Sequence, residues 1–188
     1  TKFPVMKAEN EGEGEDHGSF SELLHIPQIW IAVAANFCNV GAQIASWSSL
    51  IPYMKQYTVV SERKAALFLL STLVAMAVGR FVSTPLMRYL RPSRMLGFYG
   101  VANVVLMLVA VSRPGLVGAC AVVASGFFLS IMYPTIFALG LKGLGRNTKI
   151  GGSLLVMAIV GGAIFPAILG LIAKETGSVA AGYVVPLF

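Results

Sequence analysis

Between residues 23 and 188 the sequence contains six runs that have no Asp, Glu, Lys or Arg: 23–54, 65–79, 95–112, 114–141, 150–173 and 176–188. A helix of a water-soluble protein carries charged side chains along its outer face, and these runs supply none. About 20 apolar residues are needed to cross the roughly 30 Å hydrocarbon core of a bilayer. Most of the runs reach or approach that length, so the sequence predicts an all-α polytopic membrane protein.

The lengths of the runs set the predicted helices. The run 65–79 is about one turn short of a full span, so we expect its helix to continue through Arg80 to residue 82. The last run, 176–188, is too short to cross a membrane, and we expect it to be a truncated helix. The predicted helices are about 26–54, 63–82, 94–112, 115–141, 149–173 and 178–188.

The first 22 residues differ from the rest of the chain. They hold six of the eight acidic residues and are rich in Gly and Glu, which predicts a flexible acidic linker rather than a packed segment. The rest of the chain holds 12 Lys and Arg but only two acidic residues, Glu62 and Glu175. The whole chain has a net charge of +6. These cations lie in short loops and form no basic patch with interleaved aromatic residues. The charge therefore does not predict nucleic-acid binding.

The loop charges also predict the orientation. Cations in short loops favour the cytoplasmic side of a membrane. The loops after the second and fourth predicted helices hold seven of them, against a net excess of three on the other side. We therefore expect a multi-pass protein of the inner (plasma) membrane with the linker, 1–22, in the cytoplasm. The seven cations are Arg80, Arg88, Arg91, Arg94, Lys142, Arg146 and Lys149.

Neutral polar residues in the first predicted helix lie on one face. Asn36, Asn39, Gln43 and Ser46 follow a 3-4-3 spacing, and Trp47 adjoins them. Amide and hydroxyl groups are unfavourable against lipid, so this stripe must face protein or water. It either lines an aqueous cavity that binds a polyol or forms hydrogen bonds between helices. On the first interpretation Asn39, Gln43, Ser46 and Trp47 are candidate substrate-binding residues.

The fourth predicted helix contains Tyr133 next to Pro134. Proline has no amide hydrogen and clashes one turn back, which predicts a kink and a free carbonyl at about Ser130. Tyr133 would offer a sugar both a ring face and a hydroxyl; the alternative is a packing kink with a buried tyrosine.

A basic segment ends the second predicted helix. One interpretation is a gating role for three of its residues, Gly79, Arg80 and Arg88. The alternative is that the arginines simply anchor the helix. In that case the Arg80 guanidinium would point to the membrane interface or to a helix C-terminus.

No carboxylate, Lys or Arg lies deep in any predicted helix. Proton relays in membranes need such a group, so a proton-coupled protein would carry its coupling residues outside this chain. No His, Asp or Glu lies near a Ser or Cys of the helices, and neither histidine has a metal-ligand partner. The sequence therefore predicts that the chain is not an enzyme and needs no metal or cofactor.

Several motifs resemble the fucose permease group of the major facilitator superfamily. They are Phe37-Cys38-Asn39-Val40-Gly41-Ala42-Gln43 with Trp47-Ser48, then Gly79-Arg80-Phe81, and Ser130-Ile131-Met132-Tyr133-Pro134-Thr135-Ile136-Phe137. The likeness extends from residue 25 to the end of the chain, with the motifs in order at matching spacing.

This resemblance implies that the chain is the second six-helix half of a twelve-helix transporter. Residues 1–22 would join it to an N-terminal half, which would be its partner and would carry the proton-coupling carboxylates. The first and fourth helices of each half would line a sugar site, and the halves would rock about it in alternating access. Gly79, Arg80 and Arg88 would belong to a cytoplasmic loop motif. Proton-coupled transport of a fucose-like hexose is the expected function; an uncoupled sugar facilitator or exchanger, and a transport-inactive sensor or structural subunit, are the alternatives.

Overall fold

The computed structural model describes residues 20–187, and every regular element in that range is a helix. The α-helices, with the 3-10 helices written as η, are α1 (Phe20–Leu24), α2 (Pro27–Ser48), α3 (Leu50–Tyr57), α4 (Glu62–Leu86), α5 (Pro92–Ser112), α6 (Leu116–Leu141), η1 (Gly145–Asn147), α7 (Thr148–Met157), η2 (Ala158–Val160), α8 (Gly161–Thr176), α9 (Val179–Gly182) and η3 (Val185–Leu187). Most of the predicted linker lies outside the described residues. Its last residues, 20–22, belong to α1.

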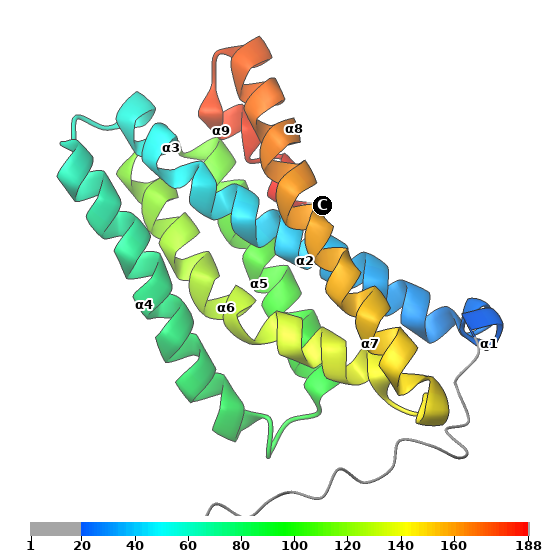
Figure 1. Cartoon of the computed structure of the whole chain (residues 1–188). Coiled ribbons are helices and arrows are strands. Elements are labelled where there is room, and N and C mark those ends of the chain that lie inside the picture. Colours follow the sequence, from blue (N-terminus) through cyan, green and yellow to red (C-terminus); the bar gives the residue numbers. More distant parts are fainter. Residues whose placement is uncertain (1–19, 188) are drawn as a thin grey trace, which may run out of the picture.

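The long helices form one bundle whose connections alternate between its two ends (Figure 1). Helix α6 packs against α2, α4 and α5, and α8 packs against α2. Five helical segments are long and apolar enough to cross a membrane: Pro27–Ser48, Glu62–Leu86, Pro92–Ser112, Leu116–Leu141 and Gly145–Thr176. The prediction of an all-α polytopic membrane protein is confirmed.

Three of the predicted helices are broken, two of them near a proline. The first, predicted as 26–54, divides at Ser49 into α2 and α3. Pro52 has no amide hydrogen for the carbonyl of Ser48, and its ring clashes with that carbonyl, so the helix bends there. The last, predicted as 178–188, is a single turn, α9, followed by η3. Its amides bond three residues back, as from Tyr183 to the carbonyl of Ala180, and Pro186 removes one amide from a continued helix.

The fifth predicted helix, 149–173, is also divided, into α7, η2 and α8. The irregular turn lies where this segment approaches α2 most closely. A Cβ atom added at Gly161 would lie 2.2 Å from the backbone oxygen of Phe37. The glycine thus allows backbone-to-backbone contact at the point where the helix changes its winding.

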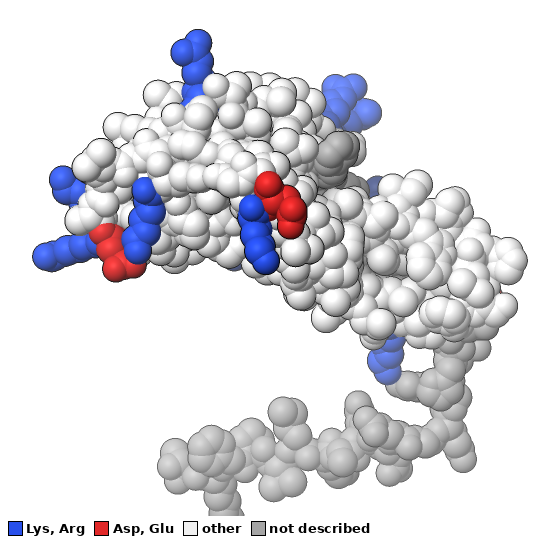
Figure 2. Space-filling view, turned by 90° about the horizontal axis from the view of Figure 1, so that it is seen from above, with Lys and Arg blue, Asp and Glu red and all other residues white. Residues whose placement is uncertain are grey.

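Hydrophobic contacts hold both ends of the bundle. At the end with α3 and α9, the fully buried Tyr53 and Tyr183 pack ring to ring at 5.2 Å, and their hydroxyls donate to the carbonyls of Ala110 and Ser46. The surface of this end is largely uncharged, and its acidic side chains lie beside basic ones (Figure 2). Leu23, Ile29 and Leu155 form the buried centre of the other end.

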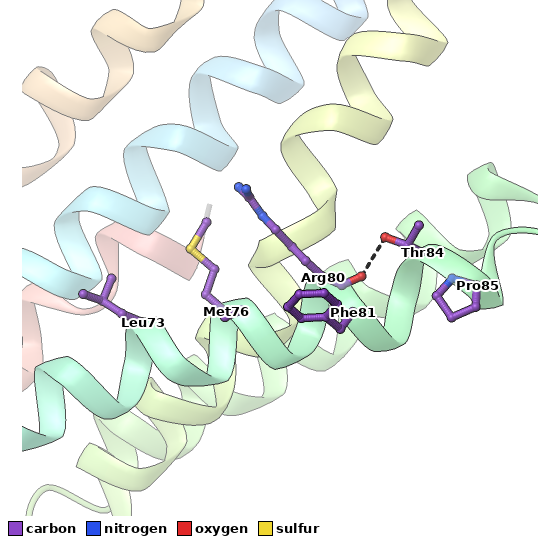
Figure 3. A pocket seen from close by; sticks show the side chains of 7 residues that line it. Leu73, Met76, Arg80, Phe81, Thr84 and Pro85 are labelled. Carbon is purple, nitrogen blue, oxygen red and sulfur yellow. Dashed lines mark hydrogen bonds between the residues drawn. The ribbon is translucent and has the colours of Figure 1, made fainter.

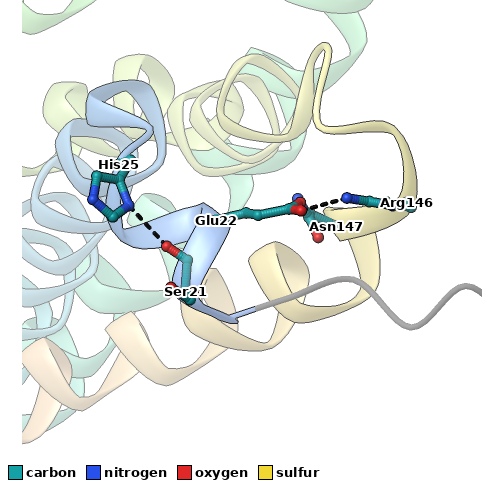
Figure 4. A network of polar contacts seen from close by, with 5 residues as sticks. All are labelled: Ser21, Glu22, His25, Arg146 and Asn147. Atoms are coloured by element: carbon teal, nitrogen blue, oxygen red, sulfur yellow. Dashed lines mark hydrogen bonds and ion pairs between the residues drawn. The ribbon is translucent and has the colours of Figure 1, made fainter.

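A polar network joins α1 to the turn between α6 and α7 (Figure 4). Glu22 forms an ion pair with Arg146 and accepts a hydrogen bond of 2.9 Å from Asn147. Gln28, at the start of α2, donates to the carbonyls of Leu139 and Lys142 at the end of α6. These bonds add a donor to two carbonyls at the end of α6, of which Leu139 otherwise has only a long bond of 3.4 Å from the Lys142 amide.

Helices α4 and α6 approach closely through two glycines. A Cβ atom at Gly79 would lie 2.4 Å from the backbone oxygen of Phe127. One at Gly126 would lie 2.8 Å from Thr72 Cγ2 and 2.9 Å from its backbone oxygen. Because a backbone neighbour cannot yield as a flexible side chain can, any residue larger than glycine must push the helices apart.

We predict that Gly126→Ala lowers the free energy of unfolding by about 1–3 kcal/mol, as overpacking does in other cores. Thermal unfolding of the full-length protein in detergent measures this. Gly97→Ala is the matched control, because a Cβ atom there meets nothing within 4 Å and alanine favours a helix by about 0.5–1 kcal/mol. Equal unfolding temperatures for the two variants would contradict the prediction.

Candidate functional site

The Arg80 side chain joins α4 to the middle of α6. Its Nε donates a hydrogen bond of 3.2 Å to the backbone oxygen of Ser130. In a regular helix that oxygen would accept from the amide of residue 134, but Pro134 has none. The freed carbonyl that the sequence predicts at Ser130 is confirmed, and Arg80 is its partner.

This contact corrects two expectations. The Arg80 guanidinium was predicted to point to the interface or to a helix C-terminus, and no cation was expected deep in a helix. Instead α4 continues to Leu86 rather than ending at residue 82, so Arg80 lies more than a turn inside it. Its side chain reaches the central part of the 26-residue α6, because the free Ser130 carbonyl attracts a strong donor and Gly79 holds the helices close.

A hollow of about 580 Å³ lies along the same face of α4 (Figure 3). Figure 3 shows Arg80 projecting from this face toward α2 and α6, with Phe81 beside it. Gln43 of α2 reaches the edge of the hollow, where its Nε2 contacts the sulfur of Met76 at 3.8 Å. We call Arg80, Phe81, Met76, Gln43 and the Ser130 carbonyl the Arg80 wall.

The predicted polar stripe of α2 divides between two environments. Asn36 donates to the carbonyl of Leu155 at 3.0 Å, and Ser46 donates to that of Ala42 at 2.7 Å. Both side chains are buried. The bond from Asn36 joins two helices, as the prediction of hydrogen bonds between helices requires. Gln43 and Trp47 are only partly buried as whole side chains, although the Trp47 Nε1 itself is buried and has no partner among the described residues. Of the four candidate residues on α2, these two are the ones that remain accessible.

Asn39 is placed differently from Gln43. It is 6% exposed and lines a separate hollow of about 280 Å³ between α2, α5, α6 and η3. Asn103 of α5 lines the same hollow and is 7% exposed. Both amide oxygens lack a hydrogen-bond partner within residues 20–187. Sequence reasoning missed Asn103, although an amide in the middle of an apolar run is the signal that would have found it.

Tyr133 lies on the α6 face that carries Ser130, because residues three apart are neighbours on a helix. Its ring stacks on that of Phe137 with centroids 6.1 Å apart, and it is partly buried. The structure joins Arg80 to Ser130 and Gln43 to Met76, and helix spacing places Tyr133 and Pro134 beside Ser130. Arg88 lies beyond the end of α4 and is exposed, so it is not part of the Arg80 wall.

Metal chemistry has no support in the part of the chain that is described. Residues 20–187 contain no group of three His, Cys, Asp or Glu that could hold a metal ion. The described spanning helices carry carboxylates only near their ends, at Glu62 and Glu175.

Comparison with known proteins identifies the family. No family model matches the chain. The L-fucose-proton symporter of Escherichia coli (strain K12) is 37% identical over 190 residues, which cover 99% of this chain and 43% of that protein. A solved structure of the major facilitator superfamily transporter FucP in the outward conformation is 36% identical, with a TM-score of 0.89 over 100% of this chain and 46% of that one. The chain belongs to the major facilitator superfamily.

Other relatives match over a shorter part of the chain. A glucose/galactose transporter of Brucella abortus biovar 1 is 38% identical over 143 residues, 75% of this chain and 35% of that protein. The chain spans less than half the length of each of these relatives. All are named as transporters, and the prediction that the chain is not an enzyme is confirmed.

The Arg80–Ser130 contact gives a second prediction. In Pro134→Ala the new amide competes with Arg80 for the Ser130 carbonyl. Arg80→Gln should therefore cost about 1.5–3 kcal/mol of stability in the natural protein, as a charged hydrogen bond does, and clearly less in the Pro134→Ala background. Thermal unfolding of the four proteins of this double-mutant cycle measures the difference.

Arg88→Gln provides the control for that cycle, because Arg88 is exposed beyond the end of α4. Its effect should add to that of Pro134→Ala within about 0.5 kcal/mol. Additive effects for Arg80→Gln as well would show that the contact with Ser130 carries no stability.

Proposed function

We propose that this chain is the C-terminal half of a sugar transporter that works by alternating access, with a fucose-like hexose as the substrate and proton symport as the mode of coupling. Its relatives include proteins named as an L-fucose-proton symporter and as glucose/galactose transporters. Since those proteins are more than twice as long as this chain, the complete transporter would include an N-terminal half that pairs with it.

The observation that supports a sugar site is the chemistry of the Arg80 wall together with Tyr133. A sugar presents hydroxyl groups that accept and donate hydrogen bonds, and apolar C–H faces that stack on aromatic rings. The guanidinium offers several donors, of which only Nε has a hydrogen bond within the described residues. Gln43 adds an amide that can donate and accept, and Tyr133 adds a ring and a hydroxyl. Asn39, Ser46 and Trp47 stay as predicted contributors to substrate binding, with Asn39 and Ser46 buried in the structure.

In this proposal Gly79 and Pro134 position the wall, and Arg80 links α4 to α6 during gating. The glycine sets the distance between the helices, and the proline provides the carbonyl that Arg80 binds. Arg88 belongs to the cytoplasmic loop rather than to the sugar site. The half would then rock as a unit against its partner about a site near the middle of the membrane.

Proton coupling would depend on the other half. Neutral groups and one guanidinium line the described wall, and a guanidinium does not release its proton in proteins. A carboxylate inside the membrane would have to come from outside this chain. An uncoupled facilitator is the second candidate, favoured by the same lack of a titratable carboxylate among the described residues of this wall.

We further propose that the protein lies in the inner membrane with the α1 end of the bundle in the cytoplasm. Arg88, Arg91 and Arg94 follow the end of α4, and Lys142 follows the end of α6, at the same end as α1 (Figure 1). This excess of cations in short loops is typical of cytoplasmic loops.

We predict that Tyr133→Ala lowers the rate of sugar uptake about tenfold or more, because loss of a stacked ring and a hydrogen bond amounts to roughly 1.4 kcal/mol or more. Uptake of labelled L-fucose, D-galactose and D-glucose into proteoliposomes of the full-length protein, with an imposed pH gradient, provides the measurement. Tyr89→Ala is the matched control, since Tyr89 is 86% exposed in the loop after α4, and should transport normally.

Three outcomes separate the candidates. Uptake driven by the gradient supports symport, whereas exchange of labelled for unlabelled sugar with no response to the gradient supports the uncoupled facilitator. Absence of both for every sugar tested would leave a sensor or structural subunit and would overturn the transport proposal.

A further inference from the structure

A second hollow lies on the α4 face that points away from the Arg80 wall. It has a volume of about 470 Å³ and is lined by residues of α4, α5, α6 and the turn between α4 and α5. Val82 and Leu86 line it, two and six positions after Arg80. At about 100° per residue these positions fall on the opposite side of the helix from Arg80. The hollow, which we call the Arg94 cleft, is thus separate from the proposed sugar site.

The inner part of the Arg94 cleft is aromatic and rigid. Tyr99, Phe127 and Phe128 contact one another with ring centroids 5.2–6.3 Å apart. The hydroxyl of Tyr99 is bonded to that of Ser83 at 2.7 Å, which fixes the ring between α4 and α5. The outer part is open, with Phe98 66% exposed. An open apolar slot of this kind suits a hydrocarbon chain.

Cations gather where the cleft reaches the end of the bundle. Arg94 lines it, and Arg88 and Arg91 lie within the six residues before Arg94. All three are exposed, and none forms an ion pair with a carboxylate among residues 20–187, where Lys55–Glu62 and Arg146–Glu22 are the pairs observed.

The positions of two of these arginines are electrostatically unfavourable for the helix itself. Arg91 is the N-cap of α5, and Arg94 lies in its first turn. The N-terminus of a helix carries partial positive charge, so cations there destabilise the helix unless an anion balances them. The charge at the mouth of the cleft therefore complements an anionic group, while the cleft beside it complements an apolar one.

We propose that the Arg94 cleft binds an anionic phospholipid of the surrounding leaflet. The phosphate would lie against Arg91 and Arg94, and an acyl chain would lie along Phe98 and Phe128. A free phosphate ion would use only the arginines and would leave the aromatic slot without an occupant. A neutral lipid would fill the slot but leave the arginines unbalanced. Only an anionic lipid complements both the arginines and the aromatic slot.

The lipid would hold α4 and α5 together at this end. Few direct contacts do so: the turn from Met87 to Arg91 joins the two helices, and both pack mainly on α6. A headgroup bound to the start of α5, with a chain against Val82 and Leu86, would brace α4 from the side opposite the Arg80 wall. This inference does not depend on the proposed transport activity, because it needs only the position of the chain in a membrane.

The test uses the full-length protein carrying Phe98→Trp, reconstituted in nanodiscs of phosphatidylcholine. Brominated phosphatidylglycerol or brominated phosphatidylcholine is added in steps, and quenching of tryptophan fluorescence is measured. The signal of the protein without Phe98→Trp is subtracted, which removes the contribution of Trp30 and Trp47. We expect half-maximal quenching by the anionic lipid at a mole fraction at least about fivefold lower, given the attraction of even one arginine for anionic headgroups.

Arg91→Gln with Arg94→Gln, in the same background, should remove this preference. Arg113→Gln is the matched control, because Arg113 lies at the other end of α5 and should leave it unchanged. A rise in salt should also weaken the preference, which tests the charge without any further substitution. Equal quenching by the two lipids, or a preference that survives either the double substitution or high salt, would overturn the proposal.

Discussion

The structure depends on one constraint of the bilayer: a backbone carbonyl without an amide partner is costly where no water can reach it. Pro134 creates such a carbonyl at Ser130, in the middle of the central helix α6. Arg80 satisfies it from α4. Gly79 and Gly126 allow the backbones to come close enough for this contact. The close packing of α4 on α6 and the placement of the Arg80 cation between them are therefore one arrangement.

Because Arg80 is used in this way, the two faces of α4 have different chemistry. The face with Arg80 and Met76 is joined to α2 and α6 through polar atoms, and it carries the donors suited to a sugar. The opposite face, with Val82 and Leu86, opens into an aromatic cleft, and its Ser83 hydroxyl is already bonded to Tyr99. A helix with two such faces can contact an aqueous path on one side and lipid on the other.

Much of the fold follows from the sequence, since charge-free runs of the right length can form only spanning helices in a bilayer. The breaks were harder to predict. Pro52 and Pro186 mark two of them, but a proline inside a helix can kink it or end it, and packing decides which. The candidate site was predictable in part. Pro134 predicts the free carbonyl at Ser130. The sequence around it does not indicate that Arg80, 50 positions earlier, binds this carbonyl. The 3-4-3 spacing placed the polar residues on one face of α2. In the structure, different parts of that face meet different neighbours: α7, α5 and the open Arg80 wall.

In the proposed transporter, the same interaction would hold the half-bundle together while it rocks. In alternating access the helices of one half have to keep their mutual contacts while the contacts with the other half change. A hydrogen bond from a guanidinium to a carbonyl without a competing amide is well suited to this, because neither group has another partner within the bundle. Arg80 still has its terminal nitrogens free within the described residues. In the proposed transporter it would fix α4 to α6 through Nε and at the same time present donors to the substrate.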